Sequence, residues 1–128
     1  MIVVEASAMA SALVDSPAPE RLLERIGSED LHSPALLDFE VASVLRGHVL
    51  GGKLTAEWLF QATADFASFE VERYQMTGAL HEILKLRDHF TVYDAAYVVL
   101  ARNLRAPLVT RDAKLLEAGR LGTEVELY

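Results

Sequence analysis

The sequence predicts an α/β fold in which a mostly parallel sheet of about four to five strands is covered by helices on both faces. Two observations lead to this prediction. Short runs of apolar residues, such as 2–4 and 107–109, are typical of strands buried on both faces. Longer stretches with helical periodicity separate these runs along the whole chain. Strands that alternate with helices pair in parallel, which predicts a three-layer α/β/α arrangement.

The N-terminal half begins with a short buried strand and continues mainly in helices. Pro19 suits the first position of a helix and Gly27 its end, while Thr55 is a plausible start for another. The pair Gly51-Gly52 separates two long helical patterns. The predicted elements are a strand at 2–5, helices at 7–14 and 19–27, a weak strand at 31–32, and helices at 36–50 and 55–68.

The C-terminal half alternates more regularly. Residues 69–74 alternate between apolar and polar side chains, as a strand does. The aromatic residues around this point, Trp58, Phe60, Phe66 and Phe69, are expected to lie mostly in the core, and a partner-binding groove is the alternative for some of them. The remaining predicted elements are helices at 76–88 and 92–105, a strand at 107–110, a short helix at 113–117 and a strand at 124–127.

Length and composition predict a single domain, residues 1–128. The chain is 52% hydrophobic with a mean hydropathy of +0.19, it has no cysteine, and no apolar run is long enough to span a bilayer. A cytoplasmic location without a membrane is the simplest interpretation. The net charge of −7 argues against binding nucleic acid through a broad basic surface, unless a bound metal ion supplies the positive charge.

Four acidic residues stand where the pattern otherwise predicts buried backbone or a helix start. Glu5 ends the first apolar run, Glu40 interrupts an apolar stretch, Asp94 opens a long apolar helix, and Asp112 follows the strand at 107–110. Sites in parallel α/β folds form beyond the carboxyl ends of the strands, where Glu5 and Asp112 both fall. Together these carboxylates predict a site for a divalent cation, Mg²⁺ or Mn²⁺, because hard cations prefer oxygen ligands.

Each acidic residue taken alone also has a purely structural interpretation. Asp94 and Thr91 fit a capping box, and Asp112 can cap the helix that begins at Ala113. Glu5 can be a solvated strand end or the partner of an arginine. Glu40 is harder to explain in this way, because its neighbours on a helix are largely apolar and a carboxylate there must be paired, protonated or bound.

The motifs around these residues resemble those of PIN-domain ribonucleases, most closely the VapC-type toxins of bacterial toxin–antitoxin pairs. The resemblance covers almost the whole chain in the expected order, and the segments around Asp94 and Asp112 are its most specific parts. It rests on the segments IVVEASA (2–8), LLDFEV (36–41), TVYDAAY (91–97) and LVTRD (108–112).

The resemblance implies a PIN-like fold and metal-dependent hydrolysis of RNA. Glu5, Glu40, Asp94 and Asp112 are then the catalytic residues and the ligands of Mg²⁺ or Mn²⁺. Thr110 matches the family's hydroxyl residue near the last aspartate, and Ser7 is a further supporting residue. The implied partners are a second copy of the chain in a homodimer, a small VapB-type antitoxin, and a structured RNA of the transfer RNA or ribosomal RNA class.

One residue departs from the family pattern, which usually has aspartate where this chain has Glu5. The extra C–C bond lengthens the side chain by roughly 1.5 Å. An alternative interpretation is therefore a PIN-like module with weakened or absent catalysis that binds antitoxin or RNA. A phosphoacceptor receiver fits poorly, because Ala6 stands where that class has a second acidic residue and Lys114 lies in the last predicted helix.

Overall fold

All five strands pair in parallel in one sheet. The computed structural model describes residues 1–128 and gives the strand order β3-β2-β1-β4-β5. Each neighbouring pair is parallel, with Val3 opposite both His32 of β2 and Leu108 of β4. The predicted α/β class with a parallel sheet is confirmed. The strands are β1 (Ile2–Val4), β2 (Leu31–Pro34), β3 (Val71–Tyr74), β4 (Leu108–Thr110) and β5 (Val125–Leu127).

Helices connect the strands, and local signals fix several of their ends. The Thr55 and Thr91 hydroxyls accept hydrogen bonds from Trp58 N and Asp94 N, both at 3.2 Å, and so cap the helices that follow. None of the helices has the length and hydrophobicity needed to span a bilayer. The α-helices are α1 (Ala6–Val14), α2 (Glu20–Gly27), α3 (Leu37–Leu50), α4 (Ala56–Ser68), α5 (Leu80–Leu84) and α6 (Val92–Leu104), and the 3₁₀ helices are η1 (Thr77–Ala79) and η2 (Ala113–Leu121).

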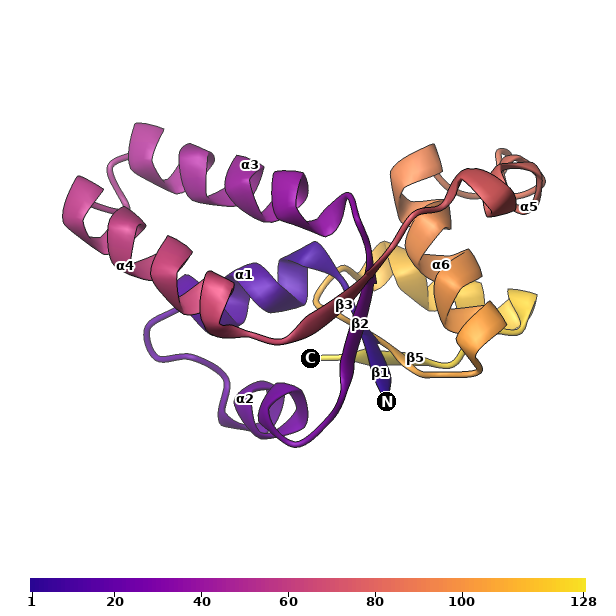
Figure 1. The fold of residues 1–128 in the computed structure, drawn as a ribbon, viewed down its shortest axis with the longest axis horizontal. Coiled ribbons are helices and arrows are strands. Elements are labelled where there is room, and N and C mark those ends of the chain that lie inside the picture. The colour runs from indigo at the N-terminus through magenta and orange to yellow at the C-terminus, as the bar shows by residue number, and fades with distance from the viewer.

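The sheet is the middle of three layers, as predicted. Figure 1 shows α1 to α4 on one side of the strands and α5 and α6 on the other. Successive side chains of a strand point to opposite faces, so each central strand serves both cores. Val3 and Leu108 pack in the core beneath α5, α6 and η2, whereas Ile2, Val4 and Val109 pack in the core beneath α1 to α4.

Two predicted helices differ in the structure. The predicted helix at 76–88 is instead the 3₁₀ turn η1 followed by the five-residue helix α5. Gly78 lies in η1 and disfavours a continuous helix. Ile83 of α5 packs into the core, and the turns beyond α5 bring Leu86 and Phe90 there as well. The predicted helix at 113–117 is a 3₁₀ helix that continues to Leu121.

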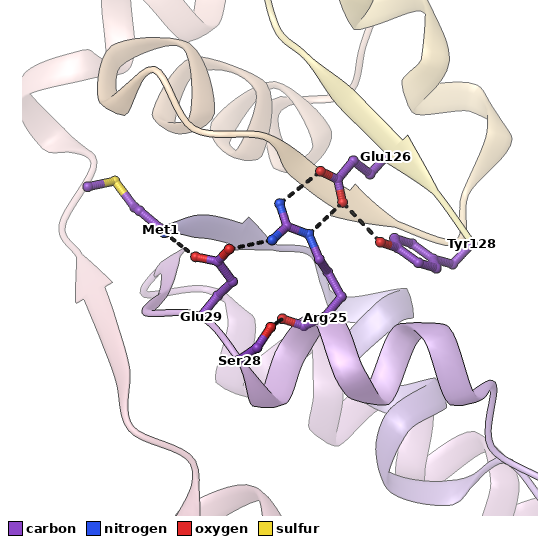
Figure 2. Close-up of polar contacts among 6 residues, drawn as sticks. All are labelled: Met1, Arg25, Ser28, Glu29, Glu126 and Tyr128. Carbon is purple, nitrogen blue, oxygen red and sulfur yellow. Dashed lines mark hydrogen bonds and ion pairs between the residues drawn. The ribbon is translucent and has the colours of Figure 1, made fainter.

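An ion-pair cluster ties α2 to the edge strand β5 (Figure 2). Arg25 donates from Nε and Nη2 to the two carboxylate oxygens of Glu126, at 2.9 Å each, and from Nη1 to Glu29. The Tyr128 hydroxyl donates to Glu126 at 3.0 Å, and the Met1 ammonium pairs with Glu29. The Arg25 guanidinium holds the pKa of the Glu126 carboxyl below its ordinary value.

Substitution of Glu126 by glutamine is expected to make stability less dependent on pH. A carboxyl with a lowered pKa in the folded state stabilises the protein above its ordinary pKa of 4.5, and this contribution disappears as the pH falls through the folded-state value. Glu126→Gln should therefore cost about 1–2 kcal/mol at neutral pH and progressively less in acid. Urea unfolding across this pH range measures the difference; a constant difference at all pH values would contradict it.

Candidate acidic site at the carboxyl edge of the sheet

All four predicted acidic residues lie at the N-terminus of a helix. Glu5 directly follows β1 and is the N-cap of α1, and Asp112 follows β4 and is the N-cap of η2. Glu40 and Asp94 lie in the first turns of α3 and α6. The positive ends of the helix dipoles face these carboxylates and offset part of their mutual repulsion.

Glu5 is buried and is held through one of its two oxygens. The residue is 7% exposed, and Oε2 accepts hydrogen bonds from Ser7 N at 3.1 Å, from Thr110 Oγ1 at 2.8 Å, and from Ser7 Oγ. Neither a solvated strand end nor an arginine pair describes Glu5, so those two structural interpretations are wrong. Because every hydrogen bond goes to Oε2, the other oxygen, Oε1, remains open for a ligand.

Glu40 combines partial burial with an unsatisfied oxygen. Its Oε1 and the hydroxyl of the buried Tyr97 have no hydrogen-bond partner. Burial raises the pKa of the Glu40 carboxyl, the nearby Tyr97 hydroxyl opposes this rise in part, and the charges of Glu5 and Asp94 add to it. The two side chains thus affect each other's pKa without meeting the geometry of a hydrogen bond, and both oxygens are unpartnered. Glu5, Glu40 and Asp94 form one electrostatic cluster.

The other two carboxylates differ in how far their capping interpretation holds. Asp94 donates its backbone N–H to Thr91, but its carboxylate makes no return bond, so only half of a capping box forms. Asp112 does cap its helix, through Oδ1 and Lys114 N at 3.0 Å, and its Oδ2 lies 3.7 Å from Lys114 Nζ. The Lys114 side chain is exposed, so this ion pair is weak.

The donor chemistry fits a hard cation, but the carboxylates do not form a closed cage. No three carboxylate or imidazole side chains of the chain are arranged to hold one ion together. Mg²⁺ is usually bound by one or two carboxylates, with waters and substrate phosphates as its other ligands. Oε1 of Glu5, which accepts no hydrogen bond, and the buried, unpartnered Oε1 of Glu40 are suitable donors for such an ion. A site of this kind needs only one or two of the four predicted carboxylates as direct ligands.

The structure also adds contacts at the site that the sequence did not reveal. Tyr97 lies one helical turn after Asp94, so helical spacing was a signal that pointed to it. The backbone amides of Arg111 and Asp112 donate to Ser7 Oγ at 2.9 Å and to Thr110 Oγ1 at 3.0 Å. No local pattern could reveal the hydrogen bond from Arg111 to Ser7, because it joins segments about a hundred residues apart.

Replacement of Glu40 by glutamine is expected to raise the melting temperature of the metal-free protein by a few degrees at neutral pH. A carboxyl whose pKa is raised in the folded state is less stable when ionised, and glutamine removes that charge at nearly constant volume. Thermal unfolding of both proteins in EDTA measures the difference. The advantage of the variant should shrink as acid protonates Glu40 in the parent; a destabilised variant at neutral pH would contradict the prediction.

The fold and the sequence identify the class of protein. The structure matches the crystal structure of PAE2754 from Pyrobaculum aerophilum with a TM-score of 0.68, over 97% of this chain and 87% of that chain, at 22% sequence identity. Residues 2–121 match the PIN domain family. The chain therefore belongs to the PIN-domain family, as its motifs predicted.

Within that family, the similar curated proteins are VapC ribonucleases. Three from Mycobacterium tuberculosis align over nearly their whole length. Ribonuclease VapC12 is 32% identical over 99% of this chain and 98% of its own, and ribonuclease VapC9 is 38% identical over 94% and 92%. Ribonuclease VapC1 is 36% identical over 98% and 96%. The chain is a VapC-type member of the PIN-domain family.

Proposed function

We propose that this chain is a metal-dependent endoribonuclease toxin that hydrolyses phosphodiester bonds of RNA. One observation carries the proposal: Glu40 has a buried oxygen without a hydrogen-bond partner, at the carboxyl edge of a VapC-type sheet. The negative charges of Glu5 and Asp94 also act on the Glu40 carboxyl. A carboxylate in this environment is destabilised until a cation or a proton neutralises it.

Each residue of the site has a role in this proposal. Glu5, Glu40, Asp94 and Asp112 hold Mg²⁺ or Mn²⁺, directly or through water, and one of these carboxylates accepts a proton from the attacking water. The ion, when bound, supplies Lewis-acid polarisation of the phosphate and lowers the pKa of a bound water. The supporting residues Ser7 and Thr110 fix the direction of the Glu5 carboxylate.

RNA is the substrate that this surface suits. Phe39 and Tyr93, which are 80% and 63% exposed, directly precede Glu40 and Asp94 in the chain. Exposed aromatic rings beside a cleavage site can stack on unpaired bases of a structured RNA, such as a loop of transfer RNA or ribosomal RNA. Because the chain carries a net charge of −7, the approach of phosphates depends on the cation rather than on a basic surface. We expect the enzyme to act in the cytoplasm, where these RNAs are.

The partners in this proposal are a VapB-type antitoxin and a second copy of the chain in a homodimer. Trp58 and Phe60 are 66% and 77% exposed, so these two aromatic residues lie outside the core in which most of the four were expected. Large exposed apolar side chains are typical of interaction surfaces. A groove of about 320 Å³ between α3 and α4 is mostly apolar and includes Leu45, Val49 and Leu59. The acidic site attracts a basic side chain from an inhibitor.

The hydrogen bonds around Glu5 support activity rather than the alternative of a disabled binding module. The longer side chain reaches the Thr110 hydroxyl at 2.8 Å and still leaves Oε1 open. Aspartate at this position would withdraw the carboxylate by roughly 1.5 Å from this donor. We therefore expect Glu5→Asp to cleave RNA no faster than the parent protein.

The test is cleavage of total transfer RNA and ribosomal RNA by the parent protein and Glu5→Asp, with Mn²⁺, Mg²⁺ or EDTA. Cleavage by the parent that requires a divalent ion supports the proposal. Activity in Glu5→Asp alone would favour the disabled binding module for the parent protein. If neither protein cleaves any RNA with either ion, the nuclease proposal fails.

A further inference from the structure

We propose that the Arg111 side chain is a positioning residue, which anchors the segment between β4 and η2 so that its backbone amides hold Glu5 in place. The inference rests on the proposed function, in which Glu5 is a metal ligand. It assigns a role to a side chain whose hydrogen bonds all go to residues other than the four site carboxylates.

Two successive amides act on Glu5 through two hydroxyls. Arg111 N donates to Ser7 Oγ at 2.9 Å, and Ser7 Oγ donates to Glu5 Oε2. Asp112 N donates to Thr110 Oγ1 at 3.0 Å, and Thr110 Oγ1 donates to the same Glu5 oxygen at 2.8 Å. A hydroxyl has a single proton to donate, so an amide bound to its oxygen directs that proton to the carboxylate. The direction of Glu5 therefore depends on where residues 111 and 112 lie.

The guanidinium of Arg111 fixes the position of this segment. Its Nη1 donates to Ser11 Oγ at 2.7 Å and to Asp15 Oδ2 at 2.6 Å, and its Nε donates to the Tyr128 carbonyl at 3.3 Å. Ser11 also donates to Asp15, which closes the network at the end of α1. One side chain thus joins the segment to the last turns of α1 and to the residue after β5.

These contacts favour a role for Arg111 as an anchor of the segment over a role in binding a phosphate of the RNA. Arg111 already satisfies its charge with Asp15, and its hydrogen bonds hold it along α1. Removal of the anchor frees the segment, and the two hydroxyls then no longer hold the Glu5 carboxylate in one direction. Substitution of a group that orients a metal ligand from outside the coordination shell typically lowers metal affinity or activity by about 10- to 100-fold.

The test compares Arg111→Met with Asp15→Ala, which removes the partner but keeps the Arg111 charge. In the metal-free protein, both variants should exchange the amide hydrogens of residues 111 and 112 faster than the parent. Both should also bind Mn²⁺ about tenfold more weakly in titration calorimetry and lower kcat for RNA with little change in KM. A phosphate contact predicts otherwise: Arg111→Met would raise KM alone, and Asp15→Ala would leave Mn²⁺ affinity unchanged.

Arg73→Met is the matched control, because Arg73 is also a partly exposed, ion-paired arginine but contacts Asp38 rather than α1 or Tyr128. It should lower the melting temperature and leave Mn²⁺ affinity and exchange at residues 111 and 112 unchanged. Unchanged amide exchange in Arg111→Met would overturn the inference, even if the parent cleaves RNA. If the parent neither binds Mn²⁺ nor cleaves RNA, the proposed function fails, and amide exchange still decides whether Arg111 is the anchor.

Discussion

Replacement of Asp94 by asparagine is expected to reduce metal-dependent RNA cleavage by about a thousandfold or more and to leave the fold intact. The Asp94 carboxylate makes no hydrogen bond within the chain, although its charge raises the pKa of Glu40. Asparagine keeps the volume and the backbone bond to Thr91 that caps α6, but it loses the negative charge that a cation requires. Cleavage rates with Mn²⁺ and thermal unfolding measure the two effects.

Asp38→Asn is the matched control for this loss of charge. Asp38 also lies in the first turn of a helix, two residues before Glu40, but its carboxylate pairs with Arg73, with Arg73 Nε at 2.9 Å from Oδ1. Its substitution should lower stability by less than about 1 kcal/mol and preserve cleavage. If Asp94→Asn cleaves RNA at the parent rate, Asp94 is not part of the catalytic site, whatever the control shows.

Replacement of Thr110 by valine is expected to affect both stability and cleavage. Thr110 is fully buried, and its hydroxyl donates to Glu5 and accepts from Asp112 N. Valine has nearly the same shape but leaves the Asp112 amide without an acceptor, which should cost about 1–3 kcal/mol. With one donor fewer on Oε2, Glu5 is less well fixed, and we expect cleavage to slow by about 10- to 100-fold. Urea unfolding and single-turnover cleavage measure these quantities.

Thr123→Val is the control that separates the effect of Thr110→Val on stability from its effect on cleavage. Thr123 is equally buried, and its hydroxyl donates to the Val98 carbonyl at 3.1 Å, on the side of the sheet that α6 covers. It should lose a similar amount of stability while its cleavage rate, measured well below the unfolding temperature, stays at that of the parent. Equal losses of activity in Thr110→Val and Thr123→Val would show that Thr110 acts through stability alone.

Much of the fold follows from local sequence signals. Short apolar runs separated by helical periodicity predicted the parallel sheet, and Thr55 and Thr91 marked helix starts that their hydroxyls do cap. The prediction was wrong where local signals competed. Residues 76–88 have helical spacing, but Gly78 and the packing of Ile83 into the core divide them into short turns.

The acidic residues were recognisable from the sequence, but their surroundings were not. A carboxylate that ends an apolar strand, as Glu5 does, or interrupts an apolar helix, as Glu40 does, is visible in the pattern itself. The exposure of Trp58 and Phe60 was not visible in the pattern, because the sequence of a helix does not reveal whether another part of the chain covers its apolar residues.

The sequence by itself therefore determined the fold class, the family and the four acidic candidates, because these depend on periodicity and on motifs that each occupy a few consecutive residues. Only the tertiary structure decided how they are held. The order of the strands places β4 beside β1 and so brings Thr110 to Glu5, and the positions of α3 after β2 and of α6 on the sheet bring Glu40 near Tyr97. Such contacts join distant segments, and their geometry follows from the packing of the whole sheet rather than from any local pattern.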